Sequence, residues 1–291
     1  MMGALEQRIR DLCNQLVDEA KGLPSVDFVR DIAAPLPLYV ICELLGAPVE
    51  DRDKIFKWSN EMIGAEDPDY AADPAEGTNA AMEVYAYANA LAAERRQRPR
   101  EDIVTKLIMP DAAGETLTEE EFDMFVLLLV VAGNETTRNA ASGGMLALFE
   151  NPEQWQRLVD ERPRAHRGRR DRPLGLPVNL FRRTATTDTV IGGQEIKEDD
   201  KVVVFYSSAN RDEDVFANPE SFDIGRDPNP HIGFGGGGAH FCLGNHLAKL
   251  ELRVLFEVLA ERLPNLAQAG PARRLRSNFI NGIKDLPVTL T

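Results

Sequence analysis

Cysteine is scarce in this chain of 291 residues, and only Cys13, Cys42 and Cys242 are present. Three widely separated cysteines do not form a disulfide framework, and their small number is typical of proteins from a reducing compartment. Long hydrophobic runs are also missing, and no run reaches the length that crosses a membrane. The N-terminus carries no secretory signal pattern. The sequence therefore predicts a cytoplasmic protein with no disulfide bond and no membrane span.

Positive charge is in short supply as well. Lysine and arginine number 33 against 47 aspartates and glutamates, which gives a net charge of -14. Nucleic-acid-binding proteins need a basic surface, so this balance argues against a nucleic acid partner. Hydrophobic residues make up 43% of the chain, as expected for a soluble globular protein, and the length suits one large domain or two small ones.

The most informative stretch runs from Phe234 to Gly244 and reads FGGGGAHFCLG. Its glycines can adopt backbone angles that other residues resist and can approach a flat ligand closely. An apolar, helix-forming run follows Cys242, and the start of a helix stabilises a thiolate. A thiolate is one of the few protein ligands that donates electron density to haem iron. The alternatives are a turn with a buried structural cysteine, or a phosphate-binding loop, which lacks its usual Gly-Lys-Ser/Thr here.

This stretch resembles the haem-binding loop of the cytochrome P450 family, the haem-thiolate monooxygenases. Phe234 lies one residue further from the cysteine than usual because of an extra glycine, as in mycobacterial-type members that act on sterols and methyl-branched lipids. The resemblance implies haem b with Cys242 as the axial iron ligand and His240 neutralising a propionate. The loop residues that would also bind the cofactor are Phe234, Gly235, Gly238 and Gly244.

A second unusual stretch lies inside a long apolar helix that we expect to begin at a capping box, Thr118 to Glu121, and to end near Asn151-Pro152. The segment Ala132 to Thr137 reads AGNETT, and a glycine followed by polar residues is out of place in a buried helix. Such local conflicts mark a functional site or a kink. The alternative is a patch of hydrogen bonds between helices.

Together with Cys242, this segment resembles the oxygen-activation motif of the same family. Glu135 takes the acid position and Thr136 the position of the catalytic hydroxyl, so the pair would deliver the protons that oxygen activation consumes. Ala132 and Gly133 are small enough for dioxygen and substrate to approach the helix. These four residues are the predicted catalytic and cofactor-facing part of the helix.

The remaining pattern predicts a mainly helical chain with small β-sheets. Helices are expected over 1–21, 28–45, 49–63, 78–96, 102–108, 151–161 and 243–263, and a loop over 64–77. Strands are expected over 178–184, 189–191 and 201–206, with a glycine turn at 192–193, and short strands over 266–291. The resemblance covers nearly the whole chain and implies one partial cytochrome P450 domain over residues 1–291. Within it, Arg183 matches a position that meets a haem propionate, whereas a solvated arginine on an edge strand is the plainer interpretation.

Four runs resemble bacterial sterol side-chain hydroxylases in particular: 33–39, 101–107, 131–139 and 229–235. The implied reaction is hydroxylation of a sterol, steroid or related lipid with dioxygen. Electrons would come from a ferredoxin and an NAD(P)H-dependent ferredoxin reductase. Lys249 and Arg253 could help to dock an acidic ferredoxin, although a solvated helix face is the simpler interpretation of two charges.

Two departures from the family pattern stand out. Family members are considerably longer, so we expect this chain to lack the N-terminal strands and helices that form one wall of the haem pocket. The second departure lies between Pro163 and Pro177, where the family has a helix with a buried Glu-x-x-Arg pair. Here the segment is basic and broken by Gly and Pro, and the only nearby Glu-x-x-Arg, Glu161 to Arg164, contains Pro163. We expect an irregular surface loop that leaves the meander before Cys242 poorly anchored.

Compensating frameshifts explain this second departure. Codons for residues 166–176, read one nucleotide later, can encode TAADEIVRWAS, which contains a Glu-x-x-Arg followed by Trp. A genuine basic loop is the alternative. The functional alternatives are an inactive remnant of such an enzyme and a haem-binding sensor without monooxygenase activity. The acid–threonine pair argues against the sensor, because binding alone needs no proton relay.

Overall fold

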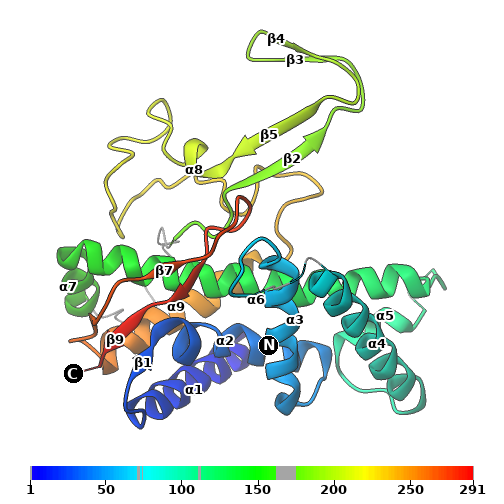
Figure 1. Cartoon of the computed structure of the whole chain (residues 1–291), viewed down its shortest axis with the longest axis horizontal. Helices are drawn as coiled ribbons and strands as arrows, with labels where there is room; N and C mark the ends of the chain where they lie inside the picture. Colours follow the sequence, from blue (N-terminus) through cyan, green and yellow to red (C-terminus); the bar gives the residue numbers. More distant parts are fainter. Residues whose placement is uncertain (1, 71–72, 74, 111–112, 162–174, 291) are drawn as a thin grey trace.

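One helix, α6 (Glu119–Glu150), runs through the middle of the molecule, and the other elements gather around it (Figure 1). The computed structural model describes residues 2–70, 73, 75–110, 113–161 and 175–290. A complete capping box fixes the start of α6, because the Thr118 side chain accepts from the Glu121 N–H and the Glu121 side chain accepts from the Thr118 N–H. The helix ends at Asn151, directly before Pro152, where proline disfavours a further helical turn.

The C-terminal half of α6 packs into the larger of two helical cores. This core combines α1 (Met2–Lys21), the π-helical turn η1 (Val29–Ala33), α7 (Pro152–Glu161) and α9 (Asn245–Arg262) with one end of α2 (Pro35–Leu45). The short sheet β1-β9-β6 joins it, with strands Val26–Asp27, Pro287–Thr289 and Ala267–Gln268. Val254, Leu255 and Leu259 of α9 are completely buried here, so this core fixes the helix that follows Cys242.

The N-terminal half of α6 packs into a second core. It is built with α2, α3 (Arg52–Ile63), α4 (Ala75–Gln97) and α5 (Ile103–Ile108), and a 3-10 turn, η2 (Val49–Asp51), precedes α3. A buried ion pair between Arg95 and Asp102 joins α4 to the cap of α5, and Arg95 also donates to the carbonyl of Gly46 at the end of α2. These contacts hold the ends of three helices together.

The strands between α7 and α9 form hairpins that extend away from the helices (Figure 1). Strand β2 (Leu180–Thr184) pairs antiparallel with β5 (Lys201–Phe205), and β3 (Thr189–Ile191) pairs with β4 (Gln194–Ile196) around Gly192-Gly193. A short helix, α8 (Tyr206–Ala209), follows β5. Near the C-terminus β7 (Arg273–Arg274) pairs with β8 (Ile283–Asp285). The expectation of a mainly helical chain with small sheets is confirmed.

The observed boundaries differ from the expected ones at several places. The helix expected over 28–45 divides at Ala34-Pro35, because proline has no N–H to continue the ladder of the preceding turn. Helix α4 begins at Ala75, inside the segment expected to be a loop, and β4 is an additional strand. The predictions for Pro163 to Pro177 fall mostly on 162–174, outside the described residues.

Candidate functional site

The loop before α9 folds back on itself around its glycines. The Cys242 N–H donates to the carbonyl of Phe234 at 3.0 Å, and the Phe241 N–H donates to the carbonyl of Gly238 at 3.1 Å. Gly235 and Gly238 have φ values of +94° and +76°, a backbone conformation that side chains disfavour. The glycines therefore make the turn that brings Phe234 beside Cys242.

Cys242 lies just outside the helix that we expected it to begin. Helix α9 starts at Asn245 with Gly244 as its cap, and both the backbone N–H and the side-chain amide of Asn245 donate to the carbonyl of Cys242. The thiol is half-buried, and this burial raises its pKa, whereas the Gly244 N–H opposes that shift by donating to the sulfur. The backbone amide of Gly244 thus offsets only part of the effect of burial on the pKa of the Cys242 thiol.

The surface around this sulfur is open and apolar. A Cβ added at Gly236, Gly238 or Gly244 would meet no atom within 4 Å. Leu243, next to the cysteine, is 80% exposed, and Phe241 on its other side is also exposed. Bare glycine backbone and apolar side chains beside a half-buried thiol fit a flat hydrophobic group such as haem, with the sulfur as its ligand.

Two candidates for propionate binding, Arg183 and His240, are exposed and carry no acidic partner among the described residues. Arg183 on β2 donates to the neighbouring carbonyl of Arg182 and stacks over the Phe181 ring at 5.6 Å, and both partners are uncharged. The His240 side chain is solvent-exposed in the turn before Cys242. Both side chains are able to pair with a carboxylate, as the prediction of propionate binding requires.

The two residues suggested for ferredoxin docking are already engaged. Arg253 pairs with Glu6 of α1 at 2.9 Å and with Glu257 at 3.2 Å. Lys249 places its ammonium 5.2 Å from the centre of the Phe234 ring. Arg253 is therefore part of an α1–α9 ion-pair network, and the simpler interpretation of a structural surface charge fits it better.

Thr136 lies on an exposed face of α6. Its hydroxyl donates to the carbonyl of Ala132 one turn earlier at 2.6 Å. The same face carries Leu128 and Met124 at successive steps of four residues, and these two side chains are 57% and 54% exposed. We name the four residues Met124, Leu128, Ala132 and Thr136 the α6 stripe. It is an apolar track that ends in one hydroxyl.

Glu135 points to a different, buried side of the helix. Its side chain is 1% exposed and forms an ion pair with Arg138, which is 2% exposed. Its other oxygen accepts from Ser59 of α3 at 3.2 Å and from Asn134 at 3.4 Å. The acid and the hydroxyl are adjacent in sequence, but the structure does not direct them into the same space.

Packing against α2 explains why residue 133 is a glycine. A Cβ at this position would clash with Cδ1 of Ile41 in α2, so a larger residue would require the end of the Ile41 side chain to shift. The contact accounts for the missing side chain without any ligand. A role of Gly133 in admitting dioxygen stays a prediction.

The loop between α8 and α9 is held by contacts that the sequence did not reveal. Arg157 of α7 pairs with Asp223 at 2.9 Å, and the Ile224 N–H donates to the Gln154 side chain. Arg226 donates to the carbonyls of 217, 218 and 221, which closes the loop on itself. These contacts connect the meander to α7, whereas the segment on which the expectation of a poorly anchored meander rested lies mostly outside the described residues. No local pattern signals this pairing, since its partners are 66 residues apart.

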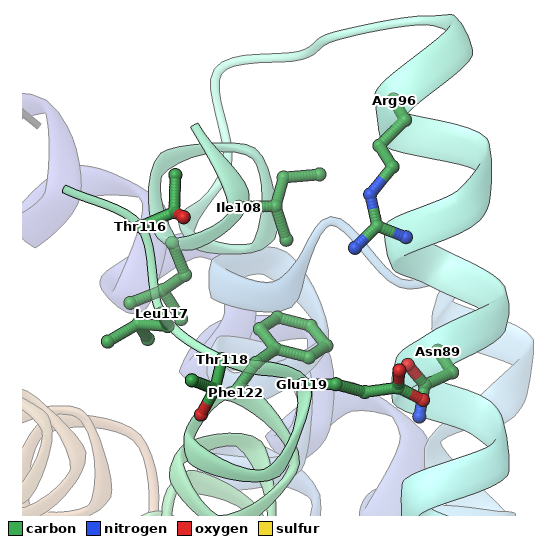
Figure 2. Close-up of a pocket in the computed structure, with 9 residues that line it drawn as sticks. Asn89, Arg96, Ile108, Thr116, Leu117, Thr118, Glu119 and Phe122 are labelled. Atoms are coloured by element: carbon green, nitrogen blue, oxygen red, sulfur yellow. The ribbon is translucent and has the colours of Figure 1, made fainter. Parts of the chain in front are cut away.

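A pocket of about 240 Å³ lies away from these residues, between α4, α5 and the start of α6. Figure 2 shows the Arg96 side chain directed toward it from α4, with Phe122 on the opposite side and Glu119 beside Asn89. None of the predicted site residues lines this pocket, so it does not belong to the candidate site. In the described part of the chain no helix is long and apolar enough to cross a membrane.

The chain is similar to several curated proteins of greater length. It is 48% identical to a steroid C26-monooxygenase of Rhodococcus jostii over 99% of this chain, and it spans 60% of that relative's length. A steroid C26-monooxygenase of Mycolicibacterium smegmatis is 46% identical over the whole chain, which spans 67% of that protein. A methyl-branched lipid omega-hydroxylase of Mycobacterium bovis is 43% identical, with 99% of this chain and 69% of the relative covered.

Solved structures agree with the sequence relatives. A Mycobacterium marinum cytochrome P450 in complex with pseudoionone superposes with a TM-score of 0.90 and 38% identity, over 98% of this chain and 70% of that one. Within this chain, residues 174–263 match the family model described as Cytochrome P450, a span that contains Arg183, the loop and the whole of α9. This chain belongs to the cytochrome P450 family.

Proposed function

We propose that this protein is a haem-thiolate monooxygenase that hydroxylates a sterol, a steroid or a related methyl-branched lipid. In this reaction one atom of dioxygen enters a C–H bond of the substrate. The other atom leaves as water after two electrons and two protons have been taken up. Haem b, when bound, supplies the oxygen chemistry, and the residues of this chain hold the cofactor, orient the substrate and move protons.

The observation that carries the proposal is the half-buried Cys242 thiol beside an open glycine backbone. Cys242 would be the iron ligand, and the bare backbone at Gly235, Gly238 and Gly244 would contact the macrocycle. Arg183 and His240 would pair with the propionates, because both are exposed cationic or titratable groups without an acidic partner among the described residues. Phe234 would pack against the cofactor from the start of the loop.

The α6 stripe supports a lipid substrate. Met124, Leu128 and Ala132 offer hydrocarbon contacts to an apolar molecule and provide no charge that would have to be desolvated. Thr136 adds the one hydroxyl on this track, at the position where a proton is needed. The names of the relatives, steroid C26-monooxygenase and methyl-branched lipid omega-hydroxylase, agree with this substrate class.

Electrons would come one at a time from a ferredoxin that is reduced by an NAD(P)H-dependent reductase. Basic groups on α9 are the natural contacts for an acidic ferredoxin. Arg253 is held by Glu6 and Glu257, so it would have to exchange these partners in order to contact a ferredoxin.

The first experiment tests cofactor binding by this chain. The chain is purified and reconstituted with haem, and the absorption of the reduced, carbon monoxide-bound form is recorded. The thiolate-type band near the long-wavelength end of the Soret region is expected from the native chain and is lost in Cys242→Ser, because a hydroxyl does not replace a thiolate as a donor.

Cys42→Ala is the matched control, since Cys42 is a buried free cysteine in α2 and has no role in the loop. This variant should keep the thiolate-type spectrum. Retention of that spectrum in Cys242→Ser, or failure of the native chain to bind haem stoichiometrically, would overturn the proposal.

A further inference from the structure

Glu135 and Thr136 are consecutive residues whose side chains leave α6 in different directions. Consecutive residues are about 100° apart around a helix, and those four apart share a face. Thr136 therefore shares the exposed face of Ala132, and Glu135 shares the buried face of Asn139. The structure therefore holds the Glu135 carboxylate away from the Thr136 hydroxyl, and the groups that hold it lie on the buried side of α6.

Both oxygens of the Glu135 carboxylate have partners on that side. Oε2 is paired with the guanidinium of Arg138, one turn further along the same helix. Oε1 accepts from the Ser59 hydroxyl at 3.2 Å and from the Asn134 amide at 3.4 Å. A buried ion pair is stable only when such further hydrogen bonds satisfy its remaining lone pairs.

Ser59 differs from the other partners because it comes from another helix. It is completely buried in α3, its oxygen accepts from Asn134 at 2.7 Å, and it lies 76 residues before Glu135 in the chain. The next residue, Asn60, accepts from the second terminal nitrogen of Arg138 at 2.8 Å. Two adjacent residues of α3 thus contact both members of the ion pair.

We propose that Ser59 is a positioning residue for Glu135, and that its hydroxyl links the orientation of this carboxylate to the position of α3. The proposal rests on the proposed monooxygenase function for the role of Glu135 as the acid. Helix α3 is packed against both α4 and α6, so a shift of α3 changes the contact with the carboxylate directly. Arg138 is also bonded to α3 through Asn60, but the Ser59 hydroxyl is the contact that α3 makes with the carboxylate itself.

The chain offers a matched control for Ser59. Ser142 is also completely buried, and its hydroxyl donates to the carbonyl of Arg138 at 2.8 Å rather than to the carboxylate. Ser142→Ala removes a buried serine hydroxyl from the same region without touching Glu135. Any loss that is common to both alanine variants is therefore a packing or desolvation effect.

The test is a pair of double-mutant cycles on thermal unfolding of the chain without haem. We expect Ser59→Ala and Glu135→Gln to be non-additive, with a combined shift in the melting temperature that differs from the sum by at least about 2 °C. Ser142→Ala and Glu135→Gln should add. Ser59→Thr, which keeps the hydroxyl, should restore the coupling. If Glu135→Gln does not fold, Glu135→Asp replaces it, because the shorter side chain withdraws the carboxylate from Ser59.

Additive behaviour of Ser59→Ala with the Glu135 variant would overturn the positioning role, whatever happens on haem addition. In the haem-loaded enzyme, Ser59→Ala should lower kcat several-fold with KM unchanged, whereas Ser142→Ala should leave kcat within about twofold. Equal losses in both variants would also overturn the proposal. Failure of the chain to bind haem contradicts the proposed function alone, since the unfolding cycles do not depend on the cofactor.

Discussion

In α7, Nη1 of Arg157 lies 2.9 Å from Oδ1 of Asp223. The same oxygen accepts from the Gly225 N–H in the loop that leads to Cys242. The Arg157 guanidinium also occupies the space beside Gly225, where a Cβ would come within 2.3 Å of one of its nitrogens. The pair thus connects a helix of the main core to the long loop that precedes the cysteine.

Replacing Arg157 by alanine should loosen this loop more than it destabilises the protein. The side chains of Arg157 and Asp223 are 37% and 42% exposed, so the pair is worth at most about 1 kcal/mol. Hydrogen exchange of the amides in 216–226 should become faster in Arg157→Ala. Gln156→Ala, which removes an exposed contact on the same helix, should leave these amides unchanged.

Thr136→Ala should divert reducing equivalents to hydrogen peroxide. The variant keeps the apolar stripe, so it should still bind substrate and consume NADH, but it loses the hydroxyl that places a proton donor on this face. The measurement is the ratio of peroxide to hydroxylated product per NADH. Thr136→Ser should retain the product, and Thr137→Val, a buried neighbour on another face, should keep the native ratio. An unchanged product yield in Thr136→Ala would contradict the role.

Stability should fall with rising pH because of Glu251 on α9. Burial raises the pKa of this carboxyl from 4.5 to about 8, and one of its oxygens has no hydrogen-bond partner among the described residues. The folded chain therefore retains a proton that the unfolded chain releases, so this contribution is complete below about pH 4.5 and is lost as the pH rises through about 8. Above about pH 8 the contribution of Glu251 to stability no longer changes with pH.

Glu251→Gln should remove this pH dependence, since the amide is neutral throughout. Urea midpoints at pH 5, 6.5 and 8 should decline in the native chain and change much less in the variant. Glu257→Gln, on the same helix but at an ion-paired position, should keep the native decline. Parallel declines in native chain and Glu251→Gln would show that another group is responsible.

Thr118→Ala should shorten or destabilise the start of α6. The substitution removes the acceptor for the Glu121 N–H in the capping box, and the loss of such a cap costs about 1 kcal/mol. A lowering of the melting temperature by about 2–4 °C is expected for a chain of this size. Thr116→Ala, an exposed threonine just before the helix, is the control and should have no measurable effect.

The helices and the cysteine loop could be predicted from the sequence because their signals are local. Apolar periodicity located α1, α3 and α9 within a few residues, and the capping box located the start of α6. The family motifs led to Cys242, Glu135 and Thr136 as the predicted site residues, and their roles stay predictions. Glycine at 235 and 238 was correctly expected to serve backbone geometry, as their positive φ values show.

The contacts that orient the candidate site could not be predicted, because they join distant segments. Ser59 bonds Glu135 across 76 residues, and Arg157 reaches Asp223 across 66. Neither serine nor arginine carries a pattern that identifies such a partner. Arg138 is the exception: opposite charges three residues apart in an otherwise apolar helix indicate a buried pair, and that signal was available in the sequence.

The α6 stripe defines a fixed length along the exposed face of the helix. Thr136 lies 12 positions after Met124, which at a rise of about 1.5 Å per residue separates them by about 18 Å along the helix. A lipid lying along this face with one end at Thr136 would have its far end fixed near Met124. The carbon that is oxidised would then depend on molecular length, so a bulkier side chain at Met124 should move oxidation by whole carbon atoms rather than abolish it.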